Sequence, residues 1–201
     1  MLAHVLRVDG TAHRATPAVT AHVAALREVT RAHRQTLQSA GLLARRLRSV
    51  LREYYPAGAA AWAHLPAGLT RPEARIVLTT APTPTRAARL TQHRLETLLT
   101  AAGRSRLISA EAARLHELFH ARALRQPADI EAAMGHRTAA LLTQLDATLT
   151  AAQTLWAEVE DLAQRHPQTT IYRSFPGMGA LLAARLLAEI GDDPQRFPHR
   201  A

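Results

Sequence analysis

The chain has 201 residues and a net charge of +9, its pI is near 11.4, and all 25 of its basic residues are arginine. It contains no cysteine, which excludes disulfides, iron–sulfur clusters and cysteine nucleophiles. No window approaches the roughly 20 apolar residues that a membrane span needs, and the first five residues lack the apolar core of a secretory signal. We therefore expect a cytoplasmic protein with no membrane contact. Its basic surface is either simply solvated or favours a polyanionic partner, nucleic acid first.

The composition favours an all-α fold. Alanine, leucine and arginine, all strong helix formers, dominate the chain, and only 4% of residues are aromatic. Residues 1–17 show no clear period, and we expect the end of a short helix followed by a loop there.

Two long segments carry the spacing of a coiled coil. The first runs from about Val19 to Tyr55 and ends at Pro56; the second follows Pro127 and ends before Pro167. In both, apolar or small residues recur at alternating threes and fours, which is typical of a heptad seam. The seam positions are Leu26, Thr30, His33, Leu37, Ala40, Ala44, Leu47, Leu51 and Tyr54 in the first, and Leu142, Leu145, Leu149, Ala152, Trp156, Val159 and Ala163 in the second. The pattern predicts an antiparallel coiled-coil arm, and it equally allows self-association through the same seam.

The residues between the two long helices predict a short helical insertion. Prolines break residues 56–85, which we expect to form a connector with at most short helices, and Pro72–Leu78 could make one or two turns within it. A helix is expected from the N-cap Thr91 to Gly103. Another is expected after Ser109, burying Leu115, Leu118 and Phe119.

A turn near the C-terminal end is the most informative local motif. Pro176, Gly177, Met178 and Gly179 open directly into an amphipathic helix that contains Arg185. Glycines let backbone N–H groups approach a ligand, and a helix N-terminus favours an anion. The motif is typical of a helix-hairpin-helix, which grips a nucleic-acid backbone without reading its sequence. A tight turn with no ligand is the equal alternative on the motif alone.

Together with its neighbours, this segment resembles the insertion-sequence transposases of the IS-one-ten family. The resemblance covers roughly the whole chain and rests on four ordered blocks of sequence. These are residues 51–56 (Leu-Arg-Glu-Tyr-Tyr-Pro), 81–84 (Ala-Pro-Thr-Pro), 101–104 (Ala-Ala-Gly-Arg), and 174–179 (Ser-Phe-Pro-Gly-Met-Gly) continuing through 184–192 (Ala-Arg-Leu-Leu-Ala-Glu-Ile-Gly-Asp) to Arg196-Phe197.

The resemblance implies a division into three parts. Residues 1–17 would follow a RuvC-like nuclease domain, 18–166 would form the helical coiled-coil region, and 167–201 would begin the transposase C-terminal domain. It also implies DNA, a structured guide (bridge) RNA and self-association as partners. Full-length members would need a divalent metal, held by an acidic tetrad, and a nucleophilic serine.

The chain departs from that pattern at both halves of the active site. Asp9 lies too late to match a metal-binding aspartate of the family, and Ser174 precedes the turn and does not match the nucleophilic serine. We therefore expect no catalytic residue, no metal site and no cofactor in this chain. The eleven histidines include His116 and His120 at i, i+4, but no third ligand is evident and we interpret them as surface residues.

The basic face of the first long helix completes the candidate site. Arg27, Arg31, Arg34, Arg45, Arg46, Arg48 and Arg52 oppose only Glu28 and Glu53 in sign. Arginines off the seam can reach successive phosphates, although they can also cover a coiled coil with their stems. The nucleic-acid-binding residues predicted from the sequence are Arg34, Arg45, Arg46, Arg48, Arg52, Pro176, Gly177, Met178, Gly179 and Arg185.

These observations favour a nucleic-acid-binding and assembly segment of a transposase, truncated and inactive alone. A complete recombinase would need the missing tetrad and serine. A non-catalytic coiled-coil adaptor that binds only protein is the alternative. Whether the chain is a remnant, a regulator or a frame with a misplaced start stays open.

Overall fold

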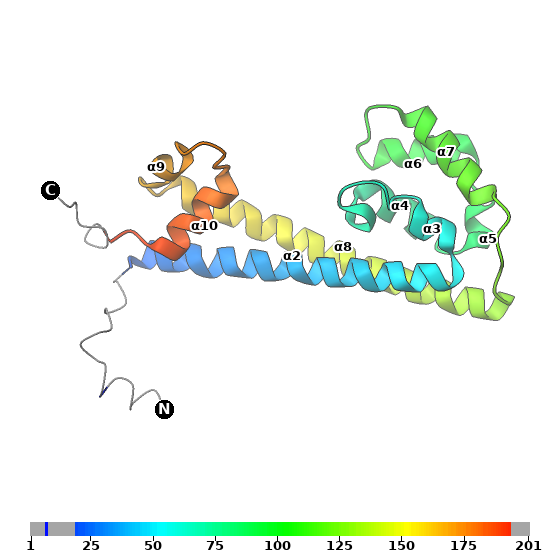
Figure 1. The fold of residues 1–201 in the computed structure, drawn as a ribbon, viewed down its shortest axis with the longest axis horizontal. Helices are drawn as coiled ribbons and strands as arrows, with labels where there is room; N and C mark the ends of the chain where they lie inside the picture. The colour runs from blue at the N-terminus through cyan, green and yellow to red at the C-terminus, as the bar shows by residue number, and fades with distance from the viewer. Residues whose placement is uncertain (1–6, 8–18, 194–201) are drawn as a thin grey trace. The chain divides into compact units, whose positions relative to one another are not determined.

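A computed structural model describes Arg7 and residues 19–193 (Figure 1). All secondary structure in this part of the chain is helical, with no β-strand, so the predicted all-α fold is confirmed. The described residues divide into two compact units, one formed by 19–33 with 154–193 and the other by 34–153. We call them unit 1 and unit 2 and describe each by itself.

Both predicted long helices are present, and each contributes to both units. Helix α2 spans Ala21–Tyr54 and helix α8 spans Ala128–Gln164. Pro127 directly precedes α8. A proline is tolerated at a helix start because the first backbone N–H groups have no intrahelical partner there, so its missing N–H costs nothing. Pro56 does more than end α2, because it is also the first residue of the short helix α3 (Pro56–Ala60).

Unit 1 packs the beginning of α2 and the end of α8 against two short helices, α9 (Thr169–Arg173) and α10 (Ala180–Ile190). The two long helices run antiparallel here, because the ring of His22 bonds the carbonyl of Leu162 at 2.8 Å while the His33 ring faces Trp156 further along. Alanines on α10 allow close packing against both. The core consists of Val23, Leu26, Val159, Leu162, Ala163, Ala184, Leu187 and Ala188.

Polar contacts fix the C-terminal end of α10 to the start of α2. Arg27 Nε donates to the carbonyl of Ala188 at 2.7 Å, and Arg31 forms two bonds to Glu189, at 3.0 and 2.8 Å. The Asp192 carboxylate accepts from the backbone N–H and hydroxyl of Thr20 at 3.2 and 2.7 Å. The side chain of Asp192 is only 9% exposed, so it is part of the packing of unit 1.

Unit 2 joins the rest of α2 and α8 through a series of short helices (Figure 1). As predicted, Thr91 caps one of them by accepting from the Arg94 N–H at 3.2 Å, and Gly103 ends it with φ +86°. The helix expected to start after Ser109 begins two residues earlier, at Ile108, and follows Leu107 at φ +51°. After α3 come η1 (Gly68–Thr70), α4 (Pro72–Thr80), α5 (Pro84–Ala87), α6 (Gln92–Ala101) and α7 (Ile108–His120).

The core of unit 2 is formed by both long helices and the insertion. Trp62 and Tyr55 are almost fully buried, and both rings contact Phe119. The predicted seam residues of α2 are buried except Leu37, which is 40% exposed. Knobs-into-holes packing and self-association stay predictions. The largest buried aliphatic side chains are Leu47, Leu51, Leu69, Leu78, Leu95, Leu99, Leu115, Leu142 and Leu145.

Helix α8 approaches the segment before α5 very closely within unit 2. Tyr54 Oη donates to the carbonyl of Pro82 and lies 2.7 Å from the Thr138 hydroxyl. A Cβ added at Gly135 would lie 2.5 Å from Thr83 Cγ2, far inside van der Waals contact. Glycine at this position therefore sets how near α8 comes to Thr83.

Candidate nucleic-acid interface

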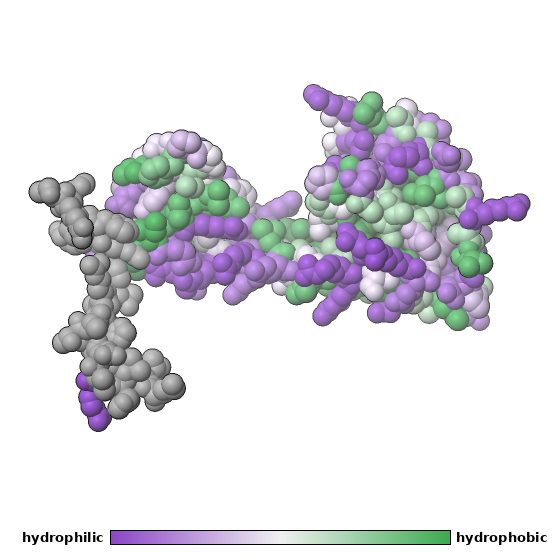
Figure 2. Space-filling model, in the orientation of Figure 1, coloured by the Kyte–Doolittle hydropathy of each residue, from purple (hydrophilic) through white to green (hydrophobic). Residues whose placement is uncertain are grey.

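The five arginines predicted to bind nucleic acid on α2 lie in unit 2. Arg34, Arg45, Arg46 and Arg52 are exposed and Arg48 is half-buried. None of the five side chains forms an ion pair or hydrogen bond with another described residue. Hydrophilic side chains gather over this part of α2 in the space-filling view (Figure 2). The four exposed arginines therefore keep their donors available to an external acceptor, and Arg48 does so in part.

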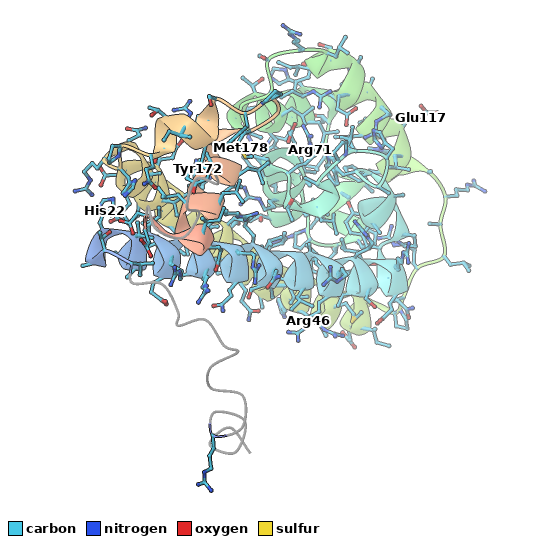
Figure 3. All side chains as sticks on the ribbon, turned by 60° about the vertical axis from the view of Figure 1, so that its left-hand side comes forward. His22, Arg46, Arg71, Glu117, Tyr172 and Met178 are labelled. Carbon is cyan, nitrogen blue, oxygen red and sulfur yellow. The ribbon has the colours of Figure 1, made fainter. Side chains whose placement is uncertain are left out.

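Three of the five arginines line one open groove of 440 Å³. Arg45, Arg48 and Arg52 occupy positions i, i+3 and i+7 and so share a face of the helix, with Ser49 and Glu53 beside them. Arg34 does not line the groove, nor does Arg46, which Figure 3 labels on α2. Ser49 was missed by the sequence reasoning, although its helical spacing from Arg45 and Arg52 places it on the same face.

Arg48 is the most firmly positioned of the three. Its Nε is buried and has no hydrogen-bond partner in unit 2, and its Nη2 would lie 3.1 Å from a Cβ added at Gly68. Gly68 has φ +46°, a conformation that suits glycine. Because Arg48 lines the groove, an anion there can bond the accessible part of its guanidinium, whereas the buried Nε lies out of an external ligand's reach.

Other arginines of unit 2 are already matched by carboxylates. The pairs are Arg71–Glu73 at 2.9 Å, Arg104–Glu73 at 3.7 Å, Arg114–Glu111 at 2.7 Å, Arg125–Glu131 at 3.2 Å, and Arg75–Asp146. The hydrogen bond from Arg114 lowers the pKa of Glu111. Burial alone would raise the pKa of Glu73, but the bond from Arg71 and the nearby charges outweigh it, so that pKa is also lowered. These arginines hold the insertion together.

The Pro176–Gly179 turn lies in unit 1, between α9 and α10. The Phe175 carbonyl accepts from the Met178 N–H at 3.1 Å, and Gly177 has φ +76°, as in a type II turn with proline second and glycine third. Gly179 has an extended φ of −73° and precedes α10 without a side-chain cap. A Cβ at either glycine would meet no atom within 4 Å. Both glycines therefore border open space, as an approaching backbone would require.

Arg185 lies on α10 at the packing with α2 in unit 1. Burial lowers the pKa of His33, and the positive charge of Arg185 lowers it further. Arg185 is half-buried, and its Nε is buried without a partner among the described residues. It belongs to unit 1, whereas the groove arginines belong to unit 2.

Metal binding and membrane crossing find no support in the described residues. No group of three or more histidine, aspartate or glutamate side chains there could hold a metal ion. His116 and His120 instead stack on each other, with ring centroids 4.0 Å apart. No helix between residues 19 and 193 is long and apolar enough to cross a bilayer.

Comparison with known proteins gives one informative relative. The chain is 46% identical over 197 residues to the "mini-circle putative transposase for IS117" of Streptomyces coelicolor. The match covers 98% of this chain and 48% of the relative, so the chain spans about half the length of the curated relative. No family model matches, and no solved structure matches. The similarity supports the resemblance to insertion-sequence transposases.

Proposed function

We propose that this chain is a nucleic-acid-binding and assembly part of an insertion-sequence transposase of the IS-one-ten type. The observation that carries the proposal is the α2 groove, where Arg45, Arg48 and Arg52 have no partner in their own unit. The similarity of almost the whole chain to a putative transposase also supports the proposal. DNA and a structured guide RNA are the proposed partners.

The groove suits contacts to phosphates more than contacts to bases. Seven residues of α-helix rise about 10 Å, so Arg45 and Arg52 can reach different phosphates of one backbone. The Pro176–Gly179 turn offers backbone N–H groups at the start of α10, in the manner of a helix-hairpin-helix. Neither feature presents an obvious set of base-reading side chains, so binding should be largely independent of sequence and strongly dependent on salt.

The proposed role is binding, and cleavage is assigned to residues that this chain does not show. Its sequence offers neither an acidic tetrad nor a matching serine. The purified chain should neither nick nor join DNA in Mg²⁺ or Mn²⁺. Metal-dependent strand cleavage that survives stringent purification would contradict the proposal.

The groove is tested by replacing Arg45, Arg48 and Arg52 with alanine and measuring affinity for RNA and DNA over a series of salt concentrations. If each touches one phosphate, the slope of log affinity against log salt should flatten by roughly two to three units. The matched control replaces Arg86, Arg89 and Arg94, which are also exposed and unpaired in unit 2. If both triple variants changed the salt slope equally, the groove arginines would contribute only through the net charge, and the groove would not be a binding site.

A coiled-coil adaptor that binds only protein is the competing function. Leu37 favours it, because this seam position stays 40% exposed on α2. If the wild type binds neither RNA nor DNA at low salt, the adaptor becomes the better function. A monomer in light scattering at micromolar concentrations would remove the assembly role from both.

A further inference from the structure

A second groove, of 330 Å³, lies in unit 1 on the outer face of α9 and the end of α10. Gln168, Ile171, Tyr172 and Phe175 follow one another at helical spacing along one wall, and Ile190 and Asp193 line the other. Ile171 is 59% exposed and Phe175 50% exposed. Figure 2 shows hydrophobic surface gathered over α9 and α10.

The lining combines flat apolar walls with hydrogen-bonding edges. Tyr172 and Phe175 supply aromatic rings, and Figure 3 labels Tyr172 on α9. The Gln168 amide provides both donors and an acceptor. An unpaired nucleobase presents the complementary chemistry, because it has a π-face for stacking and an edge for hydrogen bonds. An aliphatic helix from another protein would leave the polar edges unused.

The groove is continuous with the turn proposed to hold a phosphate. Phe175 lines the groove and also begins the turn, since its carbonyl accepts the Met178 N–H at 3.1 Å. Gly177 and Gly179 leave open space on the turn itself. A strand whose phosphate lies on the turn therefore brings its adjoining base toward the Phe175 ring.

We propose that this groove binds one unpaired base of the nucleic-acid strand whose backbone contacts the Pro176–Gly179 turn. The inference rests on the proposed function and adds to it a selection for single-stranded over duplex segments. Stacking on Phe175 and Tyr172 tolerates any base, and the Gln168 amide can both donate to and accept from the edge of that base. RNA and DNA share this chemistry, and separate arms of the experiment distinguish them.

The experiment measures affinity by fluorescence anisotropy for single strands of RNA and of DNA and for duplexes with the same number of phosphates. Phe175→Leu removes the ring, Phe175→Tyr keeps it, and Leu182→Ala is the matched control. Leu182 is equally exposed in unit 1, at 50%, but does not line the groove. Circular dichroism checks that each variant retains its helices.

Phe175→Leu should weaken single-strand binding by roughly tenfold, the size expected for one stacked base. Duplex affinity and the salt slope should not change, because no charge is removed. Phe175→Tyr and Leu182→Ala should resemble the wild type. A single strand with one abasic position at the bound site should lose its sensitivity to Phe175→Leu.

Different failures overturn different statements. A wild type that binds no nucleic acid overturns both the proposed function and this inference. A wild type that binds, with Phe175→Leu equally tight on single strands, overturns the base groove and leaves the proposed function intact. If Phe175→Leu instead lowers the oligomeric mass in sedimentation without affecting single-strand affinity, the groove is a contact between copies of the chain.

Discussion

Arginines in two regions of unit 2 differ in their surroundings: those of the helical insertion are paired with carboxylates, and those of the α2 groove are not. In the insertion, Arg71, Arg104 and Arg114 lie against carboxylates and their charge is neutralised locally. On α2, Arg45, Arg48 and Arg52 line a groove without such partners. The residue type is the same, and the local charge differs because the insertion arginines lie beside the buried acids Glu73 and Glu111, whereas the groove arginines form no ion pair with a carboxylate of the described residues.

The comparison shows why net charge is a poor guide to a binding surface. A total of +9 says only that some arginines lack partners. Unit 1 gives the same lesson, since Arg27 and Arg31 of the predicted basic face contact the end of α10. A binding surface is indicated where an arginine is both unpaired and held in place, as Arg48 is by the η1 segment.

The largest expected effect comes from removing an acid of the insertion. Glu73→Ala should lower the free energy of unfolding by about 2–4 kcal/mol, because its side chain is 7% exposed and its loss leaves Arg71 and Arg104 without their anion. Urea denaturation measures the change. Glu117→Ala is the control: Glu117 is exposed on α7 and labelled in Figure 3, and its removal should change stability by less than about 0.5 kcal/mol. Equal losses of unfolding free energy in the two variants would show that the ion pairs of Glu73 do not stabilise the insertion.

The α2 arginines should show the opposite behaviour, with affinity lost and stability kept. Replacing Arg45, Arg46 and Arg48 together should flatten the salt slope by about two units, because Arg46 lies outside the groove and each phosphate contact contributes about 0.9. Replacing Arg45, Arg48 and Arg52 should flatten it nearer to three. Binding titrations at several salt concentrations measure both slopes. Identical slopes for the two triple variants would show that an arginine in the groove contributes no more to phosphate binding than one outside it.

A smaller effect separates the two glycines of the turn in unit 1. Gly179→Ser should weaken nucleic-acid binding by roughly tenfold without loss of stability, because serine suits both the extended φ of −73° and the N-cap position. Gly177→Val should lose affinity and stability together, because a β-branched residue is strained at φ +76°. Paired thermal melts and titrations distinguish the two. Undiminished binding by Gly179→Ser would show that no ligand approaches that glycine.

The smallest expected effect is a pH dependence of the stability of unit 2. The pKa values of Glu73, Glu111 and Glu131 are all lowered from an ordinary value of 4.5. A carboxylate whose pKa is lower in the folded chain stabilises it above the unfolded pKa, and this contribution is lost as pH falls through the folded value. Thermal stability should therefore decline below about pH 4.5. Glu111→Gln should start lower and decline less over that window, and an unchanged decline would exclude this carboxylate as a cause.

The long helices could be predicted almost to the residue because their signals are local. Prolines bound α8, a heptad pattern runs through both helices, and Thr91 with Gly103 marks the ends of α6. The pairing of arginines could not be predicted in the same way. Arg104 reaches Glu73 and Arg75 reaches Asp146 across the fold of unit 2, and no periodicity encodes which acid a flexible side chain will meet.

The sequence predicts several residues of the candidate site but not which of them lie together in one groove. Helical spacing identifies the face shared by Arg45, Arg48 and Arg52, but the position of Arg48 depends on Gly68, twenty residues away in the sequence. The burial of Asp192 could not be predicted either, because its partner Thr20 lies near the other end of the sequence. The groove beside Phe175 was not recognised, although the spacing of Gln168, Ile171, Tyr172 and Phe175 was available.

The close approach of Gly135 to Thr83 has a consequence for how related sequences can diverge. With only 2.5 Å between a position-135 Cβ and the Thr83 methyl group, neither residue can grow unless the other shrinks. Homologues with this helix spacing should therefore change the two positions together, pairing alanine or serine at 135 with glycine or a small, unbranched residue at 83. By the same constraint, Gly135→Ala should destabilise the protein, and adding Thr83→Gly should restore stability. Coupled changes at positions 135 and 83 among homologues would therefore indicate that the close packing of these two positions is kept.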